Sequence, residues 1–424
     1  MFTTIQDALD FVYSTTWMGE KLDLSRITEL LERLDNPHKK LKYVHVAGTN
    51  GKGSTAALLS SVLVQAGYKT GLYTSPFIST FGERIQINHH PISDKDLIEN
   101  INTLHTHIQK MEEPTTVFET ITALAFLYFA KQACDIVVLE VGMGGRLDAT
   151  NVIDAPEVAI ITAIGLDHME QLGNTTELIA AEKAGIIKKG THVVVHPCKP
   201  SVRAVIEKKC IQEDVNALFV DEETILPLTQ SLNGQFFSVD EDRFTISLLG
   251  EHQLRNAAVA IAAVNVLISR NWNIHHEALA NGLLKAKWPC RFEVMKLNPV
   301  FIIDVAHNPQ GVREAMRTFA SLLPSQKAII IFGVMADKNY TDMIDLMSPH
   351  AAKFITVMPE NQRALPADEL ASAIKNRCAV PVSACASIPE AVDMAFAEAN
   401  NDSTIMALGS LYMAGEIRQK VMQC

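Results

Sequence analysis

The sequence predicts an α/β protein with two domains: a larger N-terminal domain with a mostly parallel sheet and a phosphate-binding loop, and a smaller, Rossmann-like C-terminal α/β domain. Three observations support this prediction. An apolar segment leads through a glycine-rich loop into a helix over residues 44–64. Strand and helix patterns alternate after it. The alternation breaks at residues 288–293, around Pro289, and then restarts, so we place the domains at residues 1–295 and 296–424.

The composition is typical of a globular protein with a large core. Of the 424 residues, 48% are hydrophobic and 20% are charged, and the net charge of −11 argues against a nucleic-acid partner. The seven cysteines contain no CxxC pair, which predicts reduced thiols rather than disulfides or a zinc site. The sequence shows no signal-peptide pattern and no apolar run that could span a bilayer, so we expect a cytoplasmic protein without a membrane partner.

The spacing of apolar residues predicts the individual elements. Helical spacing indicates helices over residues 5–13, 27–34, 94–109, 117–132, 176–188, from 251 onward, and 277–284. Short apolar runs indicate strands over residues 69–73, 135–140, 158–163, 193–195, 217–220, from 300 onward, 328–332, 353–357 and 404–407. Residues 236–249 resemble a hairpin insertion, and residues 14–26 a loop near the substrate entrance.

The glycine-rich loop has the composition of a phosphate loop. It differs from the pattern GxxxxGK[ST], because Val46 stands at the first glycine position and Gly53 follows Lys52. Glycines let the backbone direct N–H groups at an anion, and the helix N-terminus adds partial positive charge. Lys52 supplies a cation for nucleotide phosphates, and Ser54 or Thr55 a hydroxyl for Mg²⁺. A plain strand-to-helix turn is the alternative. The predicted loop comprises Gly48, Thr49, Asn50, Gly51, Lys52, Gly53 and Ser54.

Three polar residues follow predicted strands, where α/β sheets place ligands: Ser75, Glu140 and His168. Glu140 ends a continuous apolar run typical of a doubly buried strand, and a carboxylate there requires a metal or another cation. With the lysine of the loop, it would hold Mg²⁺ and a triphosphate. The alternatives are a turn-forming Ser75 before proline, a paired buried Glu140 and an ordinary loop His168.

Two more residues are candidates for a site. Lys183 lies among small and apolar residues, where a lysine usually extends its amine to solvent. Its place one helix beyond His168 favours a role in the site. Glu119 lies among apolar neighbours within residues 117–132, so it is either capped by local hydroxyls or part of a pocket.

Taken together, these motifs resemble the folylpolyglutamate synthases, including the bifunctional dihydrofolate synthases, of the Mur ligase superfamily. The resemblance covers nearly the whole chain, and the variant phosphate loop is itself expected in that family. The motifs that carry it are residues 45–54, 73–76, 83–85, 118–119, 140–151, 166–168, 182–187, 288–291, 304–309 and 409–412.

The resemblance implies an enzyme, an ATP-dependent ligase. It would phosphorylate the terminal carboxylate of a folate or of dihydropteroate and join it to L-glutamate, with the C-terminal domain on the glutamate side. Mg²⁺ is implied, with a monovalent cation such as K⁺ as a further expectation, and the family leads us to expect a monomer.

The resemblance also implies roles for individual residues. Ser75, Glu140 and His168 resemble the Mg²⁺ ligands, and Lys183 matches a lysine that is carbamylated in the family. Lys52, Lys183 and His307 would be the catalytic residues. Further contacts to the nucleotide are implied for Asn256, Arg291 and Asp304, and contacts on the pterin side for Glu119, Thr120, Thr122, Arg146, Leu147 and Asp148.

Two other functions compete with this one. The first is a Mur-type ligase for another acid, such as a cell-wall or storage-peptide precursor; the pterin-side motifs argue against it. The second is a nucleotide-binding protein without catalysis, against which Lys52, Glu140, His168 and Lys183 argue. Asp23 and Val305 stand where relatives carry glycine, and Asp23 could alter the handling of pteroate. The sequence leaves open whether dihydropteroate, reduced folates or both are acceptors.

Overall fold

The structure is a computed structural model that describes residues 1–15 and 23–424; most of the predicted entrance loop therefore lies outside the described residues. The described chain forms two compact units. The second unit takes up the chain at Lys287, earlier than the boundary expected between residues 295 and 296. The first unit comprises Met1–Leu226, Ser238–Phe244 and Leu254–Ala286, and the second comprises Pro227–Phe237, Thr245–Gln253 and Lys287–Cys424.

The first unit contains an eight-stranded sheet in the order β4-β3-β2-β5-β1-β6-β7-β8. The six strands from β2 to β8 are parallel, whereas β3 and β4 add an antiparallel edge. This confirms the predicted mostly parallel sheet. The strands are β1 (Tyr43–Ala47), β2 (Thr70–Tyr73), β3 (Ile85–Ile87), β4 (His90–Pro91), β5 (Ile136–Glu140), β6 (Val158–Ile161), β7 (His192–Val195) and β8 (Ala217–Phe219).

Helices connect these strands, as parallel pairing requires. The α-helices are α1 (Ile5–Ser14), α2 (Ser25–Arg33), α3 (Lys52–Gln65), α4 (Asp94–Ile108), α5 (Val117–Lys131), α6 (Met169–Leu172), α7 (Thr176–Ala184), α8 (Pro200–Glu213), α9 (Glu251–Ser269) and α10 (His276–Lys285). The 3₁₀-helices are η1 (Pro37–Lys40), η2 (Phe81–Arg84), η3 (Ala149–Val152) and η4 (Glu222–Thr224).

Strand β1 is the centre of this sheet, and all five of its residues are buried. It pairs with β5 on one side and β6 on the other, with Val46 opposite Glu140 and Ala47 opposite Ile161. The carboxyl ends of the three strands therefore meet at one edge of the sheet. The phosphate loop, Glu140 and the segment after β6 are neighbours for this reason.

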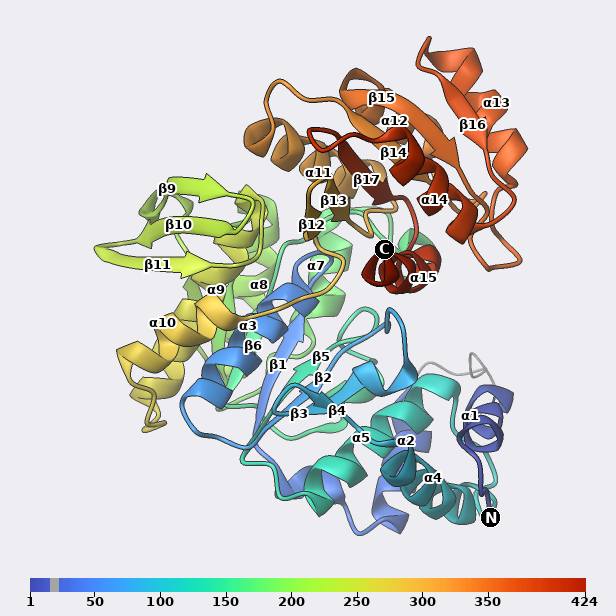
Figure 1. Cartoon of the computed structure of the whole chain (residues 1–424). Helices are drawn as coiled ribbons and strands as arrows, with labels where there is room; N and C mark the ends of the chain where they lie inside the picture. The colour runs from blue at the N-terminus through green and yellow to red at the C-terminus, as the bar shows by residue number, and fades with distance from the viewer. Residues whose placement is uncertain (16–22) are drawn as a thin grey trace. The chain divides into compact units, whose positions relative to one another are not determined.

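The helices α1, α2, α4 and α5 form a group beside the sheet (Figure 1). Their apolar residues pack with Tyr43, Val137 and Leu139 from the sheet into one core. A second core lies where α7 and α8 meet the same face, against Ala47 and Ile161. Since side chains alternate along a strand, the residue between Tyr43 and Ala47 that shares their face is His45.

Helix α3 begins and ends at glycines with left-handed backbone. Gly51 precedes it with φ of 86°, and Gly67 follows it with φ of 90°. At the latter end the N–H groups of Gly67 and Tyr68 donate to the carbonyls of Val64 and Leu63. Gly67 is thus the C′ residue that caps the end of this helix.

The second unit is a separate α/β body around a six-stranded sheet in the order β12-β13-β17-β14-β15-β16. All pairs are parallel except β12 with β13. The strands are β12 (Glu293–Leu297), β13 (Val300–Ile303), β14 (Ala328–Phe332), β15 (Ala351–Thr356), β16 (Val382–Ala384) and β17 (Thr404–Leu408). The helices are α11 (Pro309–Leu322), α12 (Tyr340–Met347), η5 (Ser348–His350), α13 (Ala367–Arg377), α14 (Ile388–Glu398) and α15 (Leu411–Gln423).

The predicted hairpin insertion is larger than expected. Three strands form a sheet in the order β11-β10-β9, with β9 (Ile225–Ser231), β10 (Gly234–Val239) and β11 (Asp242–Ile246). The sequence prediction missed β9 because the strand does not look like one. The five residues after Ile225 and Leu226 are all exposed, and they include Pro227 and three polar residues.

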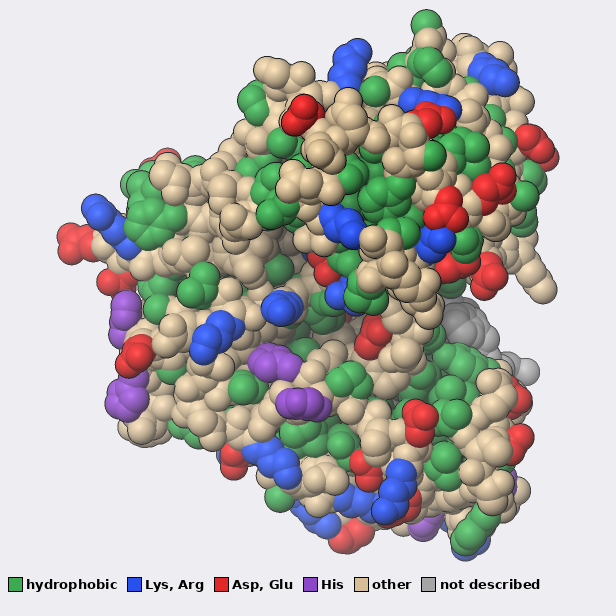
Figure 2. All heavy atoms as spheres, in the orientation of Figure 1, with side chains coloured by type: hydrophobic (Ala, Val, Ile, Leu, Met, Phe, Trp, Pro, Cys, Tyr) green, Lys and Arg blue, Asp and Glu red, His purple; other side chains and the backbone are tan. Residues whose placement is uncertain are grey.

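No helix within residues 1–15 and 23–424 is long and apolar enough to cross a bilayer. Figure 2 shows Lys and Arg side chains interspersed with Asp and Glu on the face in view. Neither sign of charge gathers there over a single element.

The contact between α3 and α10 depends on a glycine. A Cβ atom on Gly282 would lie 2.4 Å from the Cα of Val62, so an alanine there would force the two helices apart. We expect Gly282→Ala to lower the free energy of unfolding by about 1–3 kcal/mol, although alanine favours a helix. Thermal unfolding would measure this, with Leu284→Ala on the exposed side of α10 as the control, which should shift stability by less than about 0.5 kcal/mol. An unchanged or raised melting temperature for Gly282→Ala would contradict the packing described.

Candidate active site

The phosphate loop connects β1 to α3 and is shaped by contacts that exclude side chains. A Cβ on Gly48 would lie 1.7 Å from Oγ1 of Thr162, and one on Gly51 would lie 2.4 Å from Oδ1 of Asn256. Gly51 also needs its left-handed backbone to start the helix at Lys52. The loop therefore has glycine where nothing larger fits.

The loop is held to the segment after β6. The N–H of Thr49 donates to the carbonyl of Ala163 at 2.8 Å. Its hydroxyl donates to the carbonyl of Gly165 and accepts from the N–H of the same residue, both at 3.1 Å. These bonds bring Asp167 and His168, which follow in the chain, close to the loop.

Two ammonium groups converge on one carbonyl of the loop. Nζ of Lys52 donates to the carbonyl of Gly48 at 3.0 Å and to that of Thr49 at 3.2 Å. Nζ of the buried Lys183 donates to the same Gly48 carbonyl at 2.8 Å. Burial, followed by the charge of Lys52, lowers the pKa of Lys183 to about 7. The loop is therefore strongly electropositive and holds an amine that is partly neutral near pH 7.

Of the three predicted metal ligands, the structure brings two together. The N–H of Ser75 donates to Oε2 of Glu140 at 3.3 Å, at the ends of the neighbouring strands β2 and β5. Glu140 is buried. His168 is the N-cap of α6; its ring is half-exposed and lies 3.9 Å from a carboxylate oxygen of Asp167.

Within residues 1–15 and 23–424, no group of three or more His, Cys, Asp or Glu side chains is placed to hold a metal ion. The predicted ligand set has two side chains of these types, Glu140 and His168, and a serine, Ser75.

Asn256 lies in α9 and is buried against the phosphate loop at Gly51. This places one of the predicted nucleotide residues beside the loop, within the first unit.

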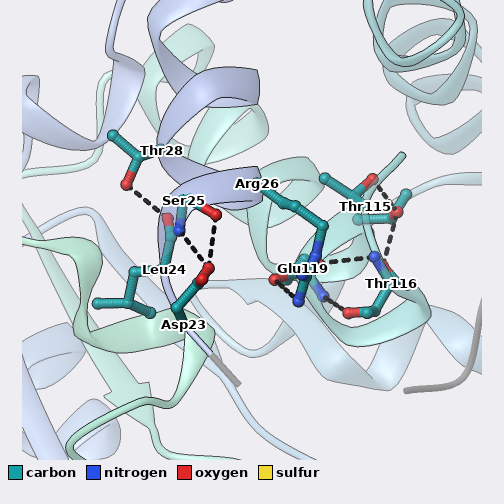
Figure 3. Close-up of polar contacts among 9 residues, drawn as sticks. Asp23, Leu24, Ser25, Arg26, Thr28, Thr115, Thr116 and Glu119 are labelled. Carbon is teal, nitrogen blue, oxygen red and sulfur yellow. Dashed lines mark hydrogen bonds and ion pairs between the residues drawn. The ribbon is translucent and has the colours of Figure 1, made fainter. Parts of the chain in front are cut away.

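Glu119 forms a buried ion pair with Arg26, as Figure 3 shows. Nε of Arg26 donates to Oε2 at 3.1 Å, and Nη2 donates to Oε1 at 3.1 Å. The same carboxylate accepts from the N–H of Thr116 at 2.7 Å, while the hydroxyl of Thr116 accepts from the N–H of Glu119. Glu119 therefore caps α5 and connects it to α2.

Thr120 and Thr122 are likewise buried and hydrogen-bonded within the protein. The hydroxyl of Thr120 is 2.8 Å from that of Thr115, and the hydroxyl of Thr122 donates to the carbonyl of Phe118. The phenol of Tyr73 is 3.0 Å from the hydroxyl of Thr122. The hydroxyls of both threonines are thus used in hydrogen bonds within the first unit.

The turn after β5 packs tightly against the end of α7. A Cβ on Gly145 would lie 2.7 Å from the carbonyl oxygen of Glu182, and one on Gly185 would lie 2.4 Å from the Cβ of Arg146. The N–H of Arg146 donates to the Glu182 carbonyl at 2.8 Å, and its guanidinium pairs with the Glu182 carboxylate at 3.0 Å. Arg146 therefore fixes the helix end that carries Lys183. The side chain of the next residue, Leu147, is half-buried.

Asp148 closes the same turn. It is buried, and its carboxylate accepts from the N–H of Met143 at 2.9 Å and from the N–H of Thr150 at 3.0 Å. Burial raises the pKa of Asp148. The hydrogen bonds lower this pKa, but burial has the larger effect.

The remaining predicted residues lie in the second unit. Asp304 and His307 follow β13, and Asp304 accepts from the N–H groups of Phe292 and Ala306 at 2.8 and 2.7 Å. Burial raises the pKa of Asp304, and the charge of Arg291 opposes this. Nδ1 of His307 is 2.9 Å from the carbonyl of Val305. Asp304 thus fixes the turn that presents Arg291.

Sequence reasoning missed three residues that shape this site: Arg26, His45 and Thr150. Nε2 of His45 is 2.9 Å from the hydroxyl of Thr150, which donates to Asp148. A signal was present, because a histidine inside an apolar strand requires a polar partner. The identity of that partner depends on the fold.

Comparisons with known proteins agree along the whole chain. The Mur ligase middle domain matches residues 46–264, and the Mur ligase glutamate ligase domain matches residues 290–411. The chain is 37% identical to the dihydrofolate synthase/folylpolyglutamate synthase of Bacillus subtilis (strain 168), over 99% of this chain and 100% of that protein.

Solved structures give the same result. The folylpolyglutamate synthase of Thermotoga maritima superposes with a TM-score of 0.88 at 31% identity, over 99% of this chain and 96% of that one. An FPGS–AMPPCP–folate complex superposes with a TM-score of 0.85 at 32% identity, over 99% of this chain and 100% of that one.

The Arg26–Glu119 pair gives a test of stability. Removal of the guanidinium leaves a buried carboxylate without its cation, so we expect Arg26→Ala to cost about 3–5 kcal/mol of unfolding free energy. The double variant Arg26→Met with Glu119→Gln should recover most of this loss, since glutamine can still cap α5.

The matched control for this variant is Arg33→Ala on the same helix. Its partner is the half-exposed Glu29, and this surface pair should contribute less than about 1 kcal/mol. Urea unfolding measures all three variants. Equal effects of Arg26→Ala and Arg33→Ala would show that burial does not strengthen the inner pair.

Proposed function

Since this chain belongs to the folylpolyglutamate synthase/dihydrofolate synthase family of Mur ligases, we propose that it joins L-glutamate to the terminal carboxylate of a folate through an acyl phosphate. It is an ATP-dependent ligase. The observation that best supports the proposed chemistry is the convergence of Lys52 and Lys183 on the Gly48 carbonyl of the phosphate loop.

The first step is the transfer of a phosphoryl group. The loop N–H groups and the start of α3 face the phosphates of ATP, and Lys52 leaves its loop carbonyls to pair with them. A carboxylate oxygen of the folate attacks the γ-phosphorus, and the bond between that phosphorus and the oxygen of ADP breaks. Positive charge at the loop stabilises the charge that develops on the transferred group.

In the second step the amine of glutamate attacks the acyl carbon. The C–N bond forms, inorganic phosphate leaves and the amine loses a proton, which gives the amide. We assign the glutamate side to the C-terminal domain, and His307 is the residue there that we propose as catalytic. Arg291 and Asp304 are proposed as further nucleotide contacts from the same turn, and Asn256 as one beside the loop.

The residues around Glu140 fit a magnesium ion. A buried carboxylate at the end of β5 lies beside Ser75 and near the phosphate loop, and oxygen ligands are those that Mg²⁺ prefers. We propose Ser75, Glu140 and His168 as its ligands. When bound, the ion would neutralise phosphate charge. The expectation of a monovalent cation such as K⁺ rests on the resemblance alone.

We further propose that Lys183 is carbamylated. Carbamylation needs a neutral amine, which attacks CO₂ and loses a proton, and the lowered pKa of Lys183 supplies such an amine near pH 7. The product is an anion in place of a second cation beside Lys52, which would relieve the repulsion between the two groups.

The acceptor, the assembly and the location are also proposals. Asp148 with Arg146 and Leu147 would form the pterin side, and Glu119, Thr120 and Thr122 would support it from behind. We propose a monomer in the cytoplasm. The absence of disulfides among the seven cysteines supports a reducing compartment.

The test of function is ATP-dependent incorporation of labelled L-glutamate, run in parallel with dihydropteroate and with a tetrahydrofolate monoglutamate. We expect product with the folate; product with both would make the chain bifunctional. Product with the folate alone would direct attention to Asp23. Product with neither, from folded protein that binds ATP, would overturn the proposal in favour of another acid acceptor.

Lys52→Ala tests the phosphate loop. Loss of the mobile cation should abolish glutamate incorporation. The circular dichroism spectrum and the melting temperature should stay close to those of the wild type, since the ammonium group of Lys52 bonds to carbonyls of its own loop. Lys40→Ala, which removes an exposed lysine, is the control. Turnover retained by Lys52→Ala would disprove the assignment of the loop.

Bicarbonate tests the carbamate. Because the neutral fraction of Lys183 rises as pH increases through about 7, carbamylation at fixed CO₂ should rise over the same interval. Enzyme depleted of CO₂ should lose activity and regain it with bicarbonate, and carbon-13 bicarbonate should give a carbamate signal that Lys183→Arg abolishes. Full activity without CO₂, together with no carbamate signal, would contradict the proposal.

A further inference from the structure

His45 is a buried imidazole in the middle of the central strand. It lies in β1 with no exposed surface, and its side chain shares a face with Tyr43 and Ala47. Burial, followed by the charge of Lys188, lowers the pKa of His45 to about 3, so the ring is neutral. A neutral polar ring at this position is costly unless it is hydrogen-bonded, and the site described above gives it no function.

The ring is the first member of a short chain of hydrogen bonds. Nε2 of His45 lies 2.9 Å from Oγ1 of Thr150, in η3. That hydroxyl lies 2.5 Å from Oδ1 of Asp148, which also accepts from the N–H of Thr150. Oδ2 of Asp148 accepts from the N–H of Met143. Hydrogen bonds thus connect the centre of the sheet to the turn after β5.

We propose that His45 is a positioning residue: through Thr150 it keeps Asp148 ionised and so fixes the Gly142–Asp148 turn for the folate. This inference rests on the proposed function for its substrate, because Asp148 is assigned to the pterin side there. The positions of the protons on His45, Thr150 and Asp148 do not depend on which substrate the protein uses.

The direction of the hydrogen bonds follows from counting protons. The Thr150 hydroxyl has one proton. The short distance to Oδ1 of Asp148 indicates that Thr150 donates this proton in a hydrogen bond to the ionised carboxylate. Thr150 must then accept from His45, so the ring carries its proton on Nε2. Nδ1 of His45 is buried and has no hydrogen-bond partner among residues 1–15 and 23–424. An unprotonated Nδ1 leaves an acceptor unpaired, which costs less free energy than an unpaired N–H donor would. This also favours the tautomer with the proton on Nε2.

The same count shows why Asp148 stays ionised. A proton on Oδ2 of Asp148 would face the N–H of Met143, which already donates to that oxygen. A proton on Oδ1 would have to be donated to Thr150, whose own proton would then point at Nε2 of His45, and the imidazole proton would move to Nδ1. Within residues 1–15 and 23–424, Nδ1 has no acceptor. The hydrogen-bond chain therefore opposes protonation of Asp148, while burial favours it. The other titratable groups that act on the two ends are Tyr73 and Lys183 near Asp148, and Lys188 near His45.

The Gly142–Asp148 turn has contacts of two kinds. The carboxylate of Asp148 accepts from the N–H of Met143, within the turn, and Gly145 packs on the backbone of Lys183, in α7. A turn released by protonation of Asp148 would disturb the folate side first. The phosphate loop has its own bonds to Ala163 and Gly165, so nucleotide binding should be unaffected.

Thr150→Val and Thr150→Ser form the test. Valine removes the hydroxyl at constant shape, and serine retains it. We expect Thr150→Val to lower kcat/KM for the folate by about tenfold or more, as for loss of a hydrogen bond to a charged group, with KM for ATP unchanged. Its acid limb in the pH profile should move to higher pH, because Asp148 has lost a hydrogen bond to its ionised form. Serine should retain the wild-type profile, and Thr106→Val, at an exposed threonine, is the control.

Histidine-selective nitrogen-15 NMR tests the proton arrangement without turnover. The signal of His45, identified by its absence in His45→Gln, should be that of a neutral ring protonated on Nε2 at neutral pH. A ring protonated on Nδ1, or a cationic ring, would overturn the inference even in a fully active enzyme. So would a Thr150→Val enzyme with unchanged folate kinetics, or equal losses for folate and ATP. Failure of the wild type to use folate would instead overturn the proposed function and leave the NMR result standing.

Discussion

The carbonyl oxygen of Gly48 is the point on which the site of the first unit depends. Lys52 and Lys183, from α3 and α7, both donate to it, and no side chain fits at Gly48 because Thr162 of the neighbouring segment fills the space. The loop is thereby held by backbone contacts together with the hydroxyl of Thr49. An anion with several oxygens can replace the carbonyls as partner of the ammonium groups with little movement of the backbone, which is what a preorganised phosphate site requires.

Behind this loop the first unit buries two groups of hydrogen-bonded polar side chains. Arg26 with Glu119 connects α2 to α5, and His45 with Thr150 and Asp148 connects β1 to the turn after β5. Buried polar networks of this kind contribute less to stability than apolar packing would, but they fix one arrangement. Of the six residues that the resemblance places on the pterin side, Glu119 and Asp148 are members of these networks.

Much of this could be predicted from the sequence, and the failures have physical reasons. The parallel sheet and the turn from β1 through a glycine-rich loop into α3 followed from local patterns, because apolar runs and glycines act within a few residues. The partner of Glu119 could not be found in this way, since Arg26 is distant in the chain and only the packing of α2 on α5 brings them together. The partner of His45 was missed for the same reason. Strand β9 was missed because its exposed residues lack the alternation of a half-buried strand.

The proposed activation of the folate carboxylate by phosphorylation at this loop is tested most directly with oxygen-18. The terminal carboxylate of the folate is labelled, and the phosphate released during glutamate addition is analysed. One labelled oxygen per turnover should appear in inorganic phosphate, because the oxygen that attacks the γ-phosphorus leaves with it. Unlabelled phosphate, with label retained in the product or found in AMP, would contradict an acyl phosphate and the role given to the loop.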